Sequence, residues 1–122
     1  MPTRPSKALG AVEIFCEQMG AQAGDEMRLE CSRRGATITI TRHRAPDRPE
    51  VDSSWTSLRI AQLRFDLEAA SWTLHWLDRH DRWHVYDDAP SSENVDPLLR
   101  EIRADPSGIF WGKPSERARV VG

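Results

Sequence analysis

The stretch RIAQLRFDLEAASWTLHWLDRHDRWHVY, residues 59–86, decides the fold. Apolar and polar side chains alternate along residues 59–66 and again along residues 71–77, which is the two-residue period of a half-buried β-strand. A third run at residues 82–86 alternates in the same way. The stretch therefore predicts three consecutive strands of an antiparallel meander, joined by two short turns.

The first hairpin of this stretch has a register that its apolar residues specify. If Asp66 pairs with Ser71, apolar side chains meet on one face of the sheet. The pairs so formed are Phe65–Trp72, Leu63–Leu74 and Ala61–Trp76. We predict this register because a slip of one residue would send one strand's apolar side chains to the opposite face.

The register of the second hairpin follows from the same argument. A loop of four residues, with His80 in the left-handed conformation, would pair Leu77 with Arg82. That register gives the pairs Trp76–Trp83, Leu74–Val85 and His75–His84. It predicts that the tryptophans build the core, and that the two histidines lie opposite each other on the polar face.

A helix is predicted near each end of the chain. Apolar residues recur at helical spacing over residues 6–20, where Ser6 is placed to cap the N-terminus and Gly20 to end the helix. Residues 91–105 show the same spacing. The buried stripe of this second helix is predicted to comprise Val95, Leu98, Leu99 and Ile102.

A further hairpin lies between the first helix and the meander. Residues 25–32 and 36–41 alternate like strands around a turn at residues 34–35, which would bring Cys31 near Ile38. The residues that follow, 43 to 57, hold two prolines and no periodicity, so we predict a long surface loop there.

These elements together predict an α+β fold. A five-stranded, mainly antiparallel meander sheet would have its Trp-rich face covered by the N-terminal and the C-terminal helix. The chain of 122 residues is long enough for one core and therefore for a single domain over residues 1–122. We place the ordered core at about residues 6–112 and a tail at residues 113–122.

Composition restricts the class of protein and of partner. A hydrophobic content of 39% with 30% charged residues is typical of a globular chain, and a net charge of −2 gives no general attraction to nucleic acid or anionic lipid. No stretch approaches the length of a membrane span, and the N-terminus lacks an apolar signal region. Cys16 and Cys31 have no zinc-binding spacing and occupy apolar-facing positions, so we expect unpaired buried thiols and a cytoplasmic location.

Four segments of the chain resemble a known family. They are MRLE (27–30), SSWTSLRIAQLRFD (53–66), SWTLHWLDRHDRWHVYDD (71–88) and DPSGIFWG (105–112). Together they resemble the small bacterial family catalogued as domain of unknown function 3024, over about residues 9–112. The resemblance implies a single-domain bacterial protein, and it implies no activity and no catalytic residue.

His75 and His84 raise the question of a metal site. Residues directly opposite on neighbouring strands have Cβ atoms about 4.5–5.5 Å apart, so two imidazoles could share one divalent metal ion. A zinc site needs at least three protein ligands, and the third would have to come from Glu30 or Asp66. Without that ligand the histidines are part of an exposed polar face. No cofactor is therefore predicted, and a divalent metal at His75 and His84 stays an alternative.

The polar face of the sheet and the loop at residues 42–57 form the predicted contact surface. It comprises Arg28, Glu30, Arg42, Arg44, Trp55, Arg64, His75, His84 and Tyr86. Arginine suits phosphate and carboxylate groups, so nucleic acid and a protein partner both stay open. Trp55 has no periodic partner and is expected either to contact a ligand or to pack on a sheet edge.

The function expected from these observations is a non-enzymatic cytoplasmic binding or interaction module, either monomeric or homodimeric, without membrane contact. The alternatives are a metal-dependent hydrolase or nuclease, and a nucleic-acid-binding domain, on the same face. The sequence contains no nucleophile elbow, P-loop or dinucleotide-binding glycine motif. A cleft that gathers His75, His84 and a carboxylate would favour an enzyme, whereas a flat polar face would favour the module.

Overall fold

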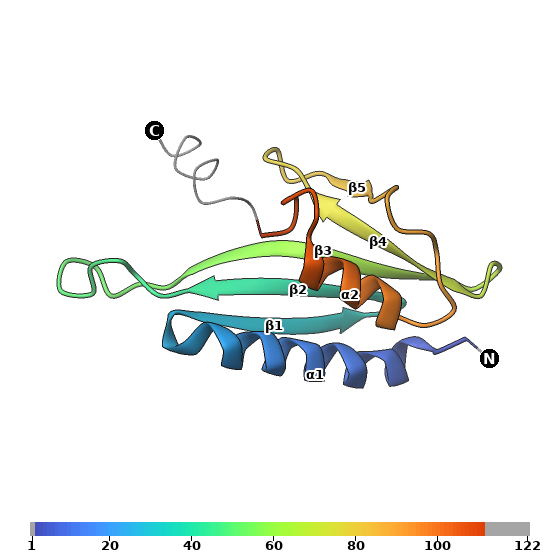
Figure 1. Ribbon diagram of the computed structural model, residues 1–122, viewed down its shortest axis with the longest axis horizontal. Coiled ribbons are helices and arrows are strands. Elements are labelled where there is room, and N and C mark those ends of the chain that lie inside the picture. The colour runs from blue at the N-terminus through green and yellow to red at the C-terminus, as the bar shows by residue number, and fades with distance from the viewer. Residues whose placement is uncertain (1, 112–122) are drawn as a thin grey trace.

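The computed structural model describes residues 2–111, which form one five-stranded sheet and two α-helices (Figure 1). In chain order the elements are α1 (Pro5–Ala23), the short 3₁₀ helix η1 (Gly24–Glu26), β1 (Met27–Arg34), β2 (Thr37–Arg44), β3 (Thr56–Asp66), β4 (Ser71–Leu77), β5 (Trp83–Val85) and α2 (Asp96–Ala104). The strands are antiparallel and follow one another across the sheet in chain order. The predicted α+β meander is therefore confirmed, while the predicted tail at residues 113–122 lies outside the described residues.

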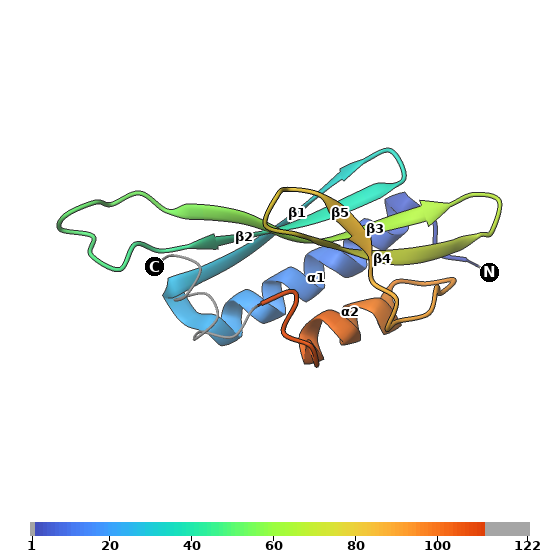
Figure 2. The same ribbon diagram turned by 90° about the horizontal axis from the view of Figure 1, so that it is seen from above.

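Both helices pack on the same face of the sheet, as Figure 2 shows. α1 runs along β1, and α2 lies beside α1. The largest fully buried side chains fill the layer between helices and sheet: Trp72, Phe110, Ile38, Ile40, Leu63, Leu74, Leu98, Ile102, Val12 and Val95. The predicted buried stripe of α2 is confirmed. In the part of the chain that the structure describes, no helix is long and apolar enough to cross a membrane.

α1 extends beyond its predicted bounds at both ends. It begins at Pro5 and continues to Ala23, so the predictions of Ser6 as N-cap and Gly20 as the end were wrong. Proline is tolerated in the first turn because the first amides of a helix have no acceptor within it. Gly20 stays inside the helix, and Gly24, with a φ of 71°, follows the last helical residue.

The β1–β2 hairpin turns one residue later than predicted, at Gly35 and Ala36. Gly35 has a φ of 59°, which suits the first central position of a type II′ turn. As a result, Cys31 pairs with Ile40 and not with Ile38. The partner has changed by two residues, so both strands keep the predicted apolar face.

β2 and β3 are longer than predicted. Their pairing continues to Arg44 and Thr56, so the connecting loop spans residues 45–55 and not 43–57. In Figure 1 this hairpin projects beyond the ends of both helices. A β-bulge at Ile60 shifts the register midway along the pair.

The predicted register of β3 and β4 is confirmed pair for pair. Asp66 pairs with Ser71, and the apolar pairs expected from that register all form. Trp72 is fully buried at the centre, with its ring 5.1 Å from that of Phe65. Its indole N–H donates a hydrogen bond of 2.7 Å to the carbonyl of Thr3, so the polar atom of this buried ring is also satisfied.

The predicted register of β4 and β5 was wrong by one residue. Leu77 pairs with Trp83 and not with Arg82, because the loop between them has five residues. Its left-handed residue is Asp81, with a φ of 61°, and not His80.

A single carboxylate organises this five-residue loop. Asp78 Oδ1 accepts the backbone N–H groups of His80 and Arg82, at 2.7 and 3.0 Å. Asp78 Oδ2 lies 2.7 Å from Nε2 of His84. These bonds stabilise the longer loop, which periodicity could not predict.

The change of register exchanges the two faces of β5. Trp83 and Val85 lie on the face away from the helices, and Val85 is 53% exposed, so the prediction that both are core residues was wrong. His84 and the following Tyr86 point toward the helices instead. Tyr86 is buried, and its hydroxyl donates to the carboxylate of Glu101 at 3.0 Å.

Asp105 fixes the segment that follows α2. It adopts the left-handed conformation at the end of the helix, with a φ of 41°. Its carboxylate accepts the backbone N–H groups of Phe110 at 3.1 Å and Trp111 at 2.9 Å. The Trp111 indole N–H donates to the carbonyl of Ile102 at 2.7 Å. The segment of residues 105–111 is therefore held against the end of α2, with Phe110 buried in the core.

Both cysteines are free, as predicted. Cys16 is buried on α1 and Cys31 is half-buried on β1. A hydrogen bond with Cys31, together with burial, raises the pKa of the Cys16 thiol, so this thiol is protonated at neutral pH.

Candidate functional site

The open face of the sheet, meaning the face turned away from α1 and α2, is the candidate site. Strand alternation and the cross-strand register assign its side chains. They are Arg28, Glu30, Ser32 and Arg34 from β1, Thr37, Thr39, Thr41 and His43 from β2, Ser57, Arg59, Gln62, Arg64 and Asp66 from β3, Ser71, Thr73, His75 and Leu77 from β4, and Trp83 and Val85 from β5. Four arginines against Glu30 and Asp66 give this face a formal charge of +2, whereas the whole chain carries −2.

The structure brings together five of the nine predicted contact residues. These are Arg28, Glu30, Arg64 and His75 on the open face, and Trp55 beside Arg28. The other four lie elsewhere: Arg42, His84 and Tyr86 on the helix side, and Arg44 in a separate hollow with Glu26 and Pro46.

His84 and Tyr86 were misplaced by the wrong register of β5, whereas Arg42 and Arg44 were misplaced because β2 is longer than predicted. The sequence assigned Arg42 to the edge of a loop, where no alternation applies, but β2 continues through it and pairs it with Leu29 and Leu58. Alternation therefore turns its side chain toward the helices, where it is only 7% exposed. One guanidinium nitrogen donates to the carbonyl of Trp111 at 3.3 Å.

The predicted pair of histidines does not form. His75 pairs with Val85 on the open face, whereas His84 pairs with Trp76 on the helix side and stacks on its ring at 4.6 Å. Hydrogen bonding by His84, with help from backbone amides of the loop, lowers the pKa of Asp78 to about 2. Within residues 2–111, no group of three or more His, Cys, Asp or Glu side chains is placed to hold a metal ion.

An arginine–tryptophan stack lies at the end of the open face next to the 45–55 loop. The guanidinium of Arg28 sits over the Trp55 ring, 4.7 Å from its centroid. Trp55 is 39% exposed. The two side chains, with Leu29, Glu30 and His43, line a cleft of about 360 Å³, which we call the Trp55 cleft. Trp55 thus packs against Arg28 of the edge strand β1, and ligand contact by its exposed part stays a prediction.

His43 is the residue of the Trp55 cleft that sequence reasoning missed, because it was assigned to the loop. Its Nδ1 lies 2.7 Å from the hydroxyl oxygen of Ser57, its cross-strand partner. Its Nε2 lies 3.5 Å from a carboxylate oxygen of Glu30. This nitrogen is buried and makes no hydrogen bond within residues 2–111, so it is an unsatisfied polar atom.

A second arginine–tryptophan stack lies on the open face beside β5. Arg59 sits over the ring of Trp83, 5.8 Å from its centroid. Its guanidinium also lies 3.7 Å from a carboxylate oxygen of Asp81, in an ion pair whose partners are both well exposed. The wrong β5 register had placed Trp83 in the core, so this stack could not be found from the sequence.

Between the two stacks the open face is polar and internally hydrogen-bonded. Gln62 donates to the hydroxyl of Thr39 at 3.0 Å and accepts from Nε of Arg64 at 2.7 Å. Thr73 and His75 Nε2 are 2.8 Å apart. These bonds link the polar side chains at the centre of the open face to one another.

The comparisons with known proteins identify a family without a function. A family model described as Domain of unknown function (DUF3024) matches residues 1–112. The chain belongs to the DUF3024 family. No curated protein and no solved structure matched it. The function of this DUF3024 protein is therefore inferred from the chemistry of its open face.

His75 of the DUF3024 protein is expected to make its stability depend on pH. Burial, followed by the charge of Arg64, lowers the pKa of His75 to about 4, so the folded protein keeps the ring neutral. The unfolded chain takes up a proton near pH 6.5, so stability is full above that pH and falls as the pH drops toward 4. We expect a loss of about 2 kcal/mol between pH 7 and pH 5 in urea unfolding. His75→Gln should flatten that slope, and an unchanged slope would contradict a buried neutral ring.

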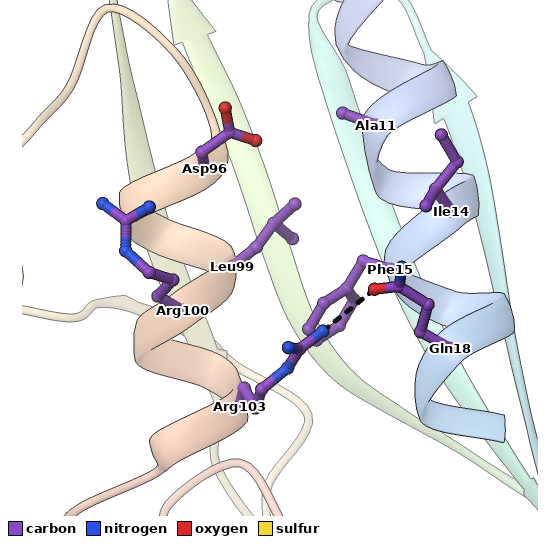
Figure 3. A pocket seen from close by; sticks show the side chains of 8 residues that line it. All are labelled: Ala11, Ile14, Phe15, Gln18, Asp96, Leu99, Arg100 and Arg103. Atoms are coloured by element: carbon purple, nitrogen blue, oxygen red, sulfur yellow. Dashed lines mark hydrogen bonds between the residues drawn. The ribbon is translucent and has the colours of Figure 1, made fainter. Parts of the chain in front are cut away.

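A second hollow of the DUF3024 protein, of about 340 Å³, lies between the two helices (Figure 3). Its floor is apolar, and Arg103 spans it from α2 to α1. The guanidinium of Arg103 donates to Gln18 at 3.2 Å and lies 5.6 Å from the centre of the Phe15 ring. These contacts join the helices, so we assign the hollow to helix packing.

Proposed function

We propose that this DUF3024 protein is a non-enzymatic cytoplasmic binding module and that its open face binds single-stranded nucleic acid. One observation carries the proposal. Trp55, which is exposed, and Trp83, which is partly buried, each lie next to an arginine on the sheet face that no helix of residues 2–111 covers.

The chemistry of such a stack suits a nucleotide. A guanidinium next to an indole can donate its edge N–H groups to phosphate oxygens, and its plane can stack with a base. Bases stacked on such platforms contribute about 1–3 kcal/mol each in single-strand-binding proteins. Because the bases of a duplex are already paired and stacked, these rings favour a single strand.

The spacing and the charge of the stacks support the same ligand. Arg28 lies on β1 and Arg59 on β3, two strands away. The residue of β3 level with Arg28 is Ser57, so Arg59 is offset by about two residues along the strand. The Cα atoms of Arg28 and Arg59 are therefore about 12 Å apart, a length that about three nucleotides would span. The positive charge of the open face contrasts with the negative charge of the whole chain, so a polyanion would be directed to this face.

The enzyme alternatives have less support from the geometry. The metal-dependent hydrolase or nuclease depended on a pair of histidines that lie on opposite faces of the sheet. Ser57, His43 and Glu30 follow the order of a hydroxyl–imidazole–carboxylate relay. The separation of 3.5 Å at its carboxylate end is too long for a strong hydrogen bond, and Ser57 lies within a paired strand and not on an exposed turn.

The proposal predicts salt-dependent binding to single strands. In fluorescence anisotropy, a labelled oligonucleotide should bind more tightly as a single strand than as a duplex. If the four arginines of the open face each neutralise one phosphate, affinity should fall about 50-fold between 50 and 200 mM salt. Arg100→Ala removes an exposed arginine on α2, away from the open face, and should bind like the parent protein. The absence of binding at 50 mM salt would overturn the proposal and direct the search to protein partners.

A further inference from the structure

The Trp55 cleft is lined by a carboxylate, Glu30, and by the imidazole of His43, whose Nε2 is buried. Ser57 can donate its hydroxyl hydrogen to Nδ1 of His43, and this tautomer leaves the imidazole proton on Nε2. The carboxylate of Glu30, 3.5 Å from Nε2, favours that proton position electrostatically. The cleft therefore presents the two acceptor oxygens of the exposed Glu30 carboxylate, with the Arg28–Trp55 pair as its wall, while Nε2–H of His43 is buried.

Glu30 is unusual for a surface that binds phosphate. It lies in the middle of the edge strand β1, whereas Asp66, the other acidic side chain of the open face, lies at the end of β3, where its carboxylate accepts the N–H groups of Glu68 and Ala69. A carboxylate repels the phosphate backbone, but it is a good acceptor for the N–H groups on a base edge. Its side chain is 71% exposed, so a ligand can reach it.

We infer that the Trp55 cleft recognises a guanine base of the bound strand, an inference that rests on the proposed function. The Watson–Crick edge of guanine carries two adjacent N–H donors beside one carbonyl oxygen. The two donors match the two oxygens of the exposed Glu30 carboxylate. Adenine, cytosine and uracil each lack the second of these adjacent donors, so their edges leave one carboxylate oxygen unpaired.

The test compares four uridine strands of about nine nucleotides that differ only at the central base. The strand with guanine is expected to bind at least about tenfold more tightly than those with adenine, cytosine or uracil. Glu30→Gln keeps the size of the side chain but replaces one acceptor by a donor, so it should bring the four affinities within about twofold. Glu68→Gln removes the same charge in the exposed β3–β4 turn and should keep the preference for guanine.

The outcomes separate this inference from the proposed function. A guanine preference that Glu30→Gln removes and Glu68→Gln retains supports the inference. Equal binding of the four strands, or a preference that survives Glu30→Gln, overturns it while leaving single-strand binding intact. If none of the strands binds, both proposals fail.

Discussion

Replacing Trp72 with alanine is expected to lower the free energy of unfolding by roughly 3–5 kcal/mol. Trp72 is fully buried between the sheet and the helices, so alanine would leave a cavity and remove the ring contact with Phe65. It would also leave the carbonyl of Thr3 without its indole donor. The loss is measured by urea unfolding of the purified variant, followed by circular dichroism.

The matched control for this prediction is Trp83→Ala. Trp83 lies on the open face, where it is only partly buried, so its removal should cost much less than the removal of Trp72. Equal losses for the two variants would mean that Trp83 is a core residue. That result would support the register of β4 and β5 that the sequence suggested and contradict the one in the structure.

Reversing the charge of both stacked arginines, in Arg28→Glu/Arg59→Glu, is expected to weaken single-strand binding at least about 100-fold. Each change removes a stacking plane and a phosphate contact, and it places a carboxylate where the backbone would lie. Fluorescence anisotropy at low salt measures the loss.

The control is Arg4→Glu/Arg100→Glu. It changes the net charge by the same amount as Arg28→Glu/Arg59→Glu, but at exposed positions just before α1 and on α2. If the two double variants lost affinity equally, binding would depend on the overall charge and not on the stacks.

The register of β3 and β4 was predictable because the apolar residues of both strands agree on one pairing. Phe65 and Trp72 agree with the other apolar pairs on one register, and the turn needs only short-range bonds to the carboxylate of Asp66. The register of β5 could not be inferred in this way. Trp83 and Tyr86 lie on opposite faces of the sheet, and an aromatic residue fits either face. The face that each β5 residue takes depends on the length of the preceding loop and hence on the hydrogen bonds of Asp78, which no periodicity reveals.

The candidate site was predictable to the extent that alternation fixed it. Arg28 and Glu30 lie in a strand of clear period, so their face was known from the sequence. His43 and Arg42 were not placed correctly, because no alternation of apolar and polar residues shows that β2 continues to Arg44, just before the proline-containing loop. Arg59 and Trp83 meet only through the tertiary arrangement of β3 and the β4–β5 hairpin.

The most direct test of single-strand binding on the open face is an NMR titration of the ¹⁵N-labelled protein with a single-stranded oligonucleotide. The five indole N–H signals report on both sides of the sheet. We predict that the signals of Trp55 and Trp83 shift with added strand, whereas that of Trp72, which is hydrogen-bonded in the core, stays in place. Shifts confined to residues of α1 and α2, or no shifts at all, would contradict the account.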